Sequence, residues 1–252
     1  MNKEERIINI SYIFTIIGTF FIGIGITYTF IKFINFNNPI EHLFDNESSS
    51  LNNNLNPDII SYIEIPTYNQ KTSGYRLGCE GVSLYMALRG LGYIPNYSLD
   101  EFMKTMPYGK TPFDGYSGNP KIGHDGENTG KRTTIYPYPL SLWAGRFASS
   151  KNLTGATVED LKDELFQGHI LLVFVTSGWN NPQWKYYPWS IDKRGEVENN
   201  HCLCVIGFNS NGDFLVSDCH DGRIDGRQGE YWIDGNKFAS IYNKRKYAIS
   251  VY

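Results

Sequence analysis

The strongest constraint on this chain is a long run without charge near its N-terminus, from Ile7 to Ile31. Arg6 precedes the run and Lys32 follows it. An apolar stretch of about 18 residues or more predicts a membrane-spanning helix, whereas the apolar part of a secretory signal has only about 7–15 residues. No small-x-small cleavage site ends the run, so we expect an uncleaved anchor rather than a removed signal peptide or a buried core helix.

The residues around this run predict how the rest of the chain is organised. Lys3 and Arg6 precede the run, which favours a cytoplasmic N-terminus and places the remaining residues outside the cytoplasm. Residues 37–58 are rich in Asn and Ser, a composition typical of a flexible linker. We therefore predict a cytoplasmic tail and transmembrane anchor in residues 1–36, then the linker, then one folded domain in residues 59–252.

Charge narrows the classes of partner that this domain could have. The formal net charge is -3 at pH 7, whereas a nucleic-acid-binding protein would carry a basic face. We expect no nucleic-acid partner and no cofactor. The expected partners are a peptide or protein substrate and, through the N-terminal helix, the membrane. The sequence does not fix the oligomeric state.

Helical patterns come first in the domain and strand patterns follow. Helices are expected to begin at Cys79, Ser98 and Thr157; Ser98 and Thr157 each start a capping-box pattern. The strand patterns are Ile170 to Val175, His201 to Phe208, Phe214 to Asp218, Tyr231 to Ile233 and Tyr247 to Tyr252. This order predicts an α+β fold with an antiparallel sheet.

Two long irregular segments are expected to shape a cleft. They are Pro107 to Pro139, rich in Gly, Pro and Tyr, and Gly178 to Ser190, rich in aromatic residues. Loops of this length are uncommon in compact domains and usually carry function or lack order.

Cys79 is the candidate nucleophile. It follows Gly78 and opens a mostly apolar helix. A thiol at a helix N-terminus lies at the positive end of the helix dipole, so we expect its pKa to fall toward that of a reactive thiolate. Cysteine is also among the most buried residue types, and this stretch alone does not exclude a core thiol.

His201 and Asp218 are expected to share one face of a hairpin. If Phe208 pairs with Asp213 across the turn, Asp218 falls opposite Leu203. Strand side chains alternate between faces, so Asp218 then lies diagonal to His201. A thiol, an imidazole base and a carboxylate that orients the imidazole are the groups that nucleophilic catalysis needs.

Four blocks of sequence together resemble a known family. They are Gln70, the Gly-Cys-Glu that opens the helix at Cys79, His201 followed by Cys-Leu-Cys-Val-Ile-Gly-Phe-Asn, and the Val-Ser-Asp that ends at Asp218. They resemble the papain-like cysteine peptidases of the double-glycine leader (bacteriocin-processing) type, over nearly all of Ile63 to Tyr252. More narrowly, the chain is similar to stand-alone, membrane-anchored members of Gram-positive bacteria.

This resemblance implies a papain-like fold and a role for each residue. Cys79 would be the nucleophile, His201 the general base and then acid, and Asp218 the group that orients His201. Gln70 would hold the oxyanion together with the backbone N–H of Cys79. The interval from Gln70 to Cys79 is longer than in papain relatives, so residues 71–77 must loop out. The expected protein is a membrane-anchored, extracytoplasmic cysteine peptidase.

Two other functions remain open from the sequence. The same groups could run acyl transfer or amide hydrolysis on non-protein or cell-wall peptide substrates, or the domain could be an inactive surface binding module.

The three cysteines near the hairpin also allow alternatives. With His201 and His220, the thiols of Cys202, Cys204 and Cys219 could form a zinc site, although Cys-x-Cys on a flat strand is poorly shaped for zinc. A disulfide between Cys202 and Cys219 would suit an extracellular domain. We expect three buried core thiols and no metal.

Overall fold

The computed structural model describes residues 58–122 and 132–252. The anchor predicted at Ile7 to Ile31 lies outside the described residues, as does all but the last residue of the predicted linker. Among the described residues, no helix is long and apolar enough to cross a membrane.

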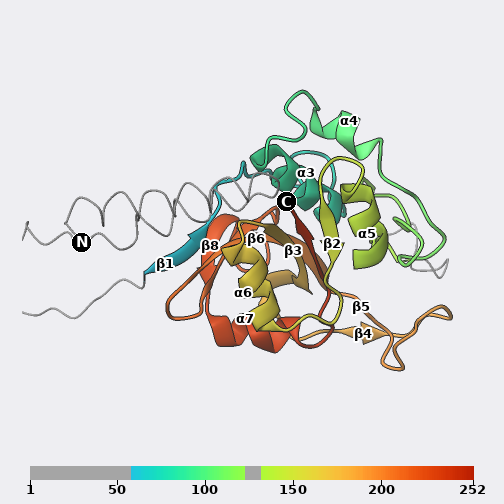
Figure 1. The fold of residues 1–252 in the computed structure, drawn as a ribbon. Coiled ribbons are helices and arrows are strands. Elements are labelled where there is room, and N and C mark those ends of the chain that lie inside the picture. The colour runs from blue at the N-terminus through green and yellow to red at the C-terminus, as the bar shows by residue number, and fades with distance from the viewer. Residues whose placement is uncertain (1–57, 123–131) are drawn as a thin grey trace, which may run out of the picture. The chain divides into compact units, whose positions relative to one another are not determined.

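An antiparallel sheet organises the described residues (Figure 1). Its strands run in the order β2-β9-β3-β6-β7-β8, and β1 also pairs with β6. Their bounds are β1 (Ile59–Tyr62), β2 (Ser150–Asn152), β3 (Ile170–Thr176), β6 (Asn200–Asn209), β7 (Phe214–Asp218), β8 (Gly229–Ile233) and β9 (Ala248–Val251). The short strands β4 (Trp184–Lys185) and β5 (Glu196–Val197) form a separate pair.

Helices cover both faces of this sheet (Figure 1). The core on one face contains residues of α3 (Cys79–Gly90), α4 (Leu99–Met103) and α5 (Pro137–Ala144). The core on the other face contains residues of α6 (Val158–Phe166) and α7 (Gly235–Tyr242). Helices mixed with an antiparallel sheet confirm the predicted α+β class.

Local signals in the sequence account for several of these elements. The capping boxes expected at Ser98 and Thr157 are both formed, and they start α4 and α6. Every residue of β3 is buried, because this continuous apolar strand lies between the two helical layers. A short 3-10 turn, η1 (Ser177–Trp179), follows β3.

The hairpin of β6 and β7 departs from the predicted register near its turn. Phe208 pairs with Phe214, not with Asp213 as predicted. An irregularity between Val205 and Gly207 then adds one residue to β6, a β-bulge.

Beyond the bulge the pairing returns to the predicted register. Cys204 pairs with Ser217, and the next step along the hairpin places Asp218 level with Leu203. His201 and Asp218 therefore share one face, as expected from the sequence.

Gly207 lies where β1 passes close to the bulge. A Cβ atom added there would lie 2.2 Å from the backbone carbonyl oxygen of Ser61, which cannot move without shifting β1. Glycine in a strand often marks a bulge or a close backbone approach, and both occur here.

We expect Gly207→Ala to lower the free energy of unfolding by about 1–3 kcal/mol, because the added methyl group overpacks the contact between β1 and β6. Urea unfolding followed by circular dichroism measures this. Gly145→Ala is the matched control, since Gly145 has ordinary helical backbone angles at the end of α5. Equal stability of the two variants would contradict the close approach.

Candidate active site

Cys79 is the first residue of α3, directly after the N-cap residue Gly78. The helix is buried from Cys79 to Leu88 and packs on β6. Two polar contacts fix it there: the Ser83 hydroxyl donates to the carbonyl oxygen of Cys202 (3.1 Å), and the Cys204 thiol donates to the carbonyl oxygen of Ser83 (3.1 Å). This packing holds the N-terminus of α3 beside the end of β6.

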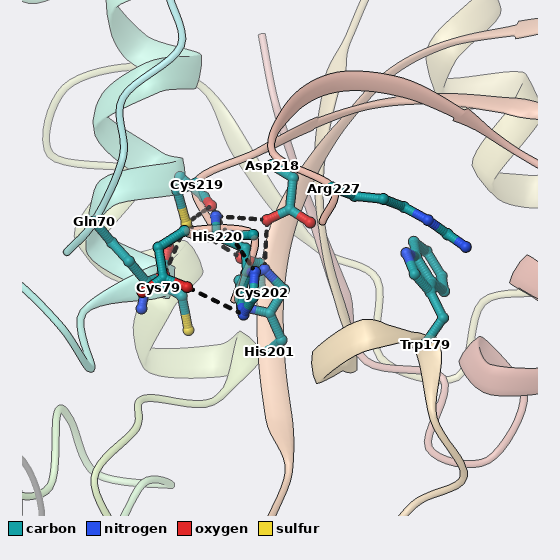
Figure 2. Close-up of polar contacts among 12 residues, drawn as sticks. Gln70, Cys79, Trp179, His201, Cys202, Asp218, Cys219, His220 and Arg227 are labelled. Carbon is teal, nitrogen blue, oxygen red and sulfur yellow. Dashed lines mark hydrogen bonds and ion pairs between the residues drawn. The ribbon is translucent and has the colours of Figure 1, made fainter. Parts of the chain in front are cut away.

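His201 and Asp218 form a buried pair at the same end of the sheet (Figure 2). The His201 Nε2 atom lies 2.6 Å from Asp218 Oδ1. The same carboxylate oxygen accepts the backbone N–H of His220 at 2.8 Å. The carboxylate is thereby fixed in orientation and can in turn fix the imidazole.

Two aromatic residues complete the surroundings of Asp218, and the sequence did not indicate them. The Tyr231 hydroxyl donates to Asp218 Oδ2 at 2.7 Å. Trp179 Nε1 donates to that hydroxyl at 2.9 Å. Both oxygens of the Asp218 carboxylate therefore have donors. Tyr231 and Trp179 lie far apart in the sequence, so no motif joins them to His201.

The electrostatics of this pair make the imidazole a stronger base than an ordinary histidine. Burial lowers the pKa of His201, but the charge of Asp218 and the hydrogen bond to it raise the pKa above the usual histidine value. Burial likewise raises the pKa of Asp218, but the charge of His201 and the donated hydrogen bonds leave it below the usual value. The carboxylate is ionised and supports an imidazolium.

Cys79 differs from its expected state. Its thiol donates to Glu80 Oε2 at 3.3 Å, and no hydrogen bond joins it to His201 in the part of the chain that the structure describes. Burial first and the charge of Glu80 second raise the pKa of Cys79 well above its usual range. The predicted lowering of this pKa is wrong, because it considered the helix dipole and neither burial nor the neighbouring carboxylate.

Gln70 lies beside Cys79 and Cys219 (Figure 2). Its side-chain Nε2 donates to the carbonyl oxygen of Arg76 (2.6 Å), and its Oε1 accepts from the Cys219 thiol (3.1 Å). The backbone N–H of Tyr75 donates to the carbonyl oxygen of Gln70 (2.8 Å), which closes the loop that the long interval required. An amide nitrogen carries two hydrogens, and the contact with Arg76 uses one of them.

One cavity of about 200 Å³ brings these side chains together. Gln70, Cys79 and His201 line it, and Asp218 lies behind His201. Of the two irregular segments expected to shape the cleft, the first contributes Arg132 and Thr133. The second, Gly178 to Ser190, contributes none of the lining residues, so that expectation is wrong for this cavity.

The alternatives for the remaining thiols can be compared with the geometry. All four cysteines are free, so the disulfide considered for Cys202 and Cys219 is not formed. Potential ligand atoms of His201, Asp218 and Cys219 lie within 4.8 Å of one another. His201 Nε2 and Asp218 Oδ1 are already hydrogen-bonded to each other, and the Cys219 thiol donates to Gln70 Oε1. Cys202 and Cys204, which the zinc alternative needed, pack in the core beneath α3.

Comparison with known proteins supports the resemblance at the level of the family. The model of the Peptidase_C39 like family matches residues 62–250. The crystal structure of a candidate C39-like peptidase from Bacillus anthracis matches with a TM-score of 0.59 and 18% sequence identity, covering 77% of this chain and 98% of that chain. This structural likeness shows a shared fold. None of the curated proteins matches the chain.

We expect Asp218→Asn to bring the pKa of His201 below the usual value of about 6.5, because burial remains while the charge that opposes it is removed. A titration of labelled histidine by NMR measures the change. Asp225→Asn is the control: Asp225 also raises the pKa of His201 but ranks below Asp218 among the causes, so its loss should lower the pKa less. An unchanged pKa in Asp218→Asn would contradict the pairing.

Proposed function

Since this chain belongs to the C39-like peptidase family, we propose that it is a cysteine peptidase that cleaves peptide bonds with Cys79, His201, Asp218 and Gln70. The observation that supports this most is the shared cavity. A cysteine at a helix start, a glutamine and a histidine line it, and the histidine is bound to a buried carboxylate.

In the proposed first step His201 takes the proton of Cys79, and the thiolate attacks the substrate carbonyl carbon. The thiol must first turn away from Glu80, its hydrogen-bond acceptor in the substrate-free structure. The spare amide hydrogen of Gln70 and the backbone N–H of Cys79 would then bind the oxyanion. N–H groups of the first helical turn have no acceptor within their own helix, so they suit this role.

In the proposed second step the imidazolium of His201 donates its proton to the leaving amine, and an acyl-enzyme remains on Cys79. Water attacks the acyl group while His201 acts as base, and the thiol is restored. Asp218 stays ionised throughout and stabilises the imidazolium. Tyr231 keeps the carboxylate in place from its other oxygen.

The proposal extends to the location of the enzyme. The uncharged run from Ile7 to Ile31 would anchor it in the cell membrane by a single helix, with the peptidase domain outside the cytoplasm. A surface protein, a secreted peptide or a peptidoglycan stem peptide would then be within reach.

We expect Cys79→Ala to abolish hydrolysis of a peptide library, followed by mass spectrometry, while circular dichroism stays unchanged. His201→Ala should slow hydrolysis more than Asp218→Ala, because the base is lost in the first and only its orientation in the second. Cys202→Ala is the matched control, since this buried thiol lies outside the cavity lining and the contact that Ser83 makes there is to the backbone carbonyl of residue 202, which remains.

Hydrolysis that persists in Cys79→Ala would overturn the mechanism. Transfer of the acyl group to an added amine, with little hydrolysis, would replace the peptidase with an acyltransferase that uses the same residues.

We expect Gln70→Ala to lower kcat by about 10²–10³-fold with a small change in KM, because the oxyanion forms only after attack on the carbonyl. Steady-state kinetics on a cleaved peptide measures both constants. Gln167→Ala, on the exposed end of α6, should change neither. A rise in KM alone would assign Gln70 to substrate binding.

A further inference from the structure

Glu80 is the one acidic side chain that is hydrogen-bonded to the candidate nucleophile, Cys79, in the described part of the chain. Its Oε2 atom accepts the Cys79 thiol at 3.3 Å. Glu80 is only 1% exposed, and it lines the same cavity as His201. The catalytic scheme above gives this buried carboxylate no role.

The other oxygen of Glu80 is held by fixed donors. Its Oε1 atom accepts from the hydroxyl of Thr134 and from Asn200 Nδ2 at 3.3 Å. The Asn200 amide also donates to the Thr134 hydroxyl at 3.2 Å. Each hydrogen bond that the Glu80 carboxylate makes with the described residues comes from a donor, which suits the ionised form, because an ionised carboxylate only accepts.

A positive charge nearby supports this ionised form. Arg132 is buried, and its guanidinium donates to the carbonyl oxygens of Val197 and Glu198, both at 2.6 Å. Burial raises the pKa of Glu80 above its usual value, and the Thr134 hydroxyl, the Cys79 thiol and the charge of Arg132 limit this rise.

Groups from several elements face this pair of side chains. The titratable or charged ones are Glu80 itself on α3, Tyr116 and Arg132 from the loops, His201 and Cys202 on β6, and Cys219 after β7. Arg76, Glu198, His220, Asp221 and Arg223 line the rest of the cavity. Among these described groups only Glu80 accepts a hydrogen bond from the Cys79 thiol.

A carboxylate in this position opposes loss of the thiol proton. A Cys79 thiolate beside ionised Glu80 would place two negative charges next to each other in a buried site, which disfavours the thiolate. The thiolate, not the thiol, is the species that alkylating agents and oxidants attack. A neutral thiol held on Glu80 is therefore protected.

We propose that Glu80 keeps Cys79 protonated in the substrate-free enzyme, and that the proton moves to His201 only when the thiol turns from Glu80 to a bound substrate. In this transfer the S–H bond of Cys79 breaks and an N–H bond forms on the imidazole, giving a thiolate and an imidazolium. The inference rests on the proposed function, because it assigns a control to that nucleophile.

The test is the rate of alkylation of Cys79 by iodoacetamide in the full-length protein without substrate, measured by peptide mass spectrometry over a range of pH. For Glu80→Gln we expect alkylation at pH 7 to be at least about tenfold faster, with the profile displaced to lower pH, since one pKa unit corresponds to a tenfold change in thiolate. Equal or slower alkylation in the folded variant would overturn the inference.

Glu164→Gln is the matched control. Glu164 is also a buried carboxylate, but its partners are Lys151 and His169 on the α6 side of the sheet. This substitution should leave the alkylation of Cys79 unchanged. Faster alkylation in both variants would point to general loosening and would also overturn the specific role of Glu80.

Alkylation of the wild-type protein is a second test, and it does not depend on whether any variant folds. Its Cys79 should be alkylated rapidly only at a pH above the usual thiol range, and rapid alkylation below neutral pH would overturn the inference. Cys79→Ala separates this result from the proposed function. If that variant loses hydrolysis while Glu80→Gln leaves alkylation unchanged, only the role of Glu80 fails; if it keeps hydrolysis, the proposed function fails.

Discussion

The pairing of His201 with Asp218 depends on one additional residue in β6. From the turn, Phe208 pairs with Phe214, and a regular ladder in that register would place Asp218 on the face of Cys202 and Cys204. The bulge between Val205 and Gly207 reverses the alternation. Asp218 then lies on the face of His201, and the 2.6 Å contact can form.

This dependence explains both the success and the error of the sequence reasoning about the hairpin. A regular ladder from Phe208 and Asp213, the register predicted from the sequence, is wrong at the turn. One shift at the turn and one at the bulge cancel, so the face shared by His201 and Asp218 was predicted correctly. Gly207 was the available signal for the bulge, because glycine inside a strand often marks one.

Local patterns predicted the secondary structure better than they predicted the state of the site. Capping boxes and the apolar β3 strand involve residues close in sequence, and they appear as expected. The state of Cys79 depends instead on burial and on a carboxylate fixed by Thr134 and Asn200, which come from distant segments. No spacing rule relates those positions.

The charges in the site are divided between two separate pairs. His201 is hydrogen-bonded to Asp218, and the Cys79 thiol donates a hydrogen bond to Glu80. Burial disfavours both the Cys79 thiolate and the His201 imidazolium. At His201 the charge of Asp218 outweighs burial, whereas at Cys79 the charge of Glu80 adds to it. The chemistry proposed above therefore begins with a movement of the sulfur atom from one pair to the other.

The contact between β1 and β6 lies far along β6 from the candidate active site. β1 pairs with residues around Gly207, whereas His201 lies near the opposite end of the same strand. At about 3.3 Å per residue, the two positions are roughly 20 Å apart. A tension applied to the chain ahead of residue 59 would therefore act on the β1 contact in the sheet before it reached the cavity, so the number of residues ahead of β1 can vary while the cavity keeps its geometry.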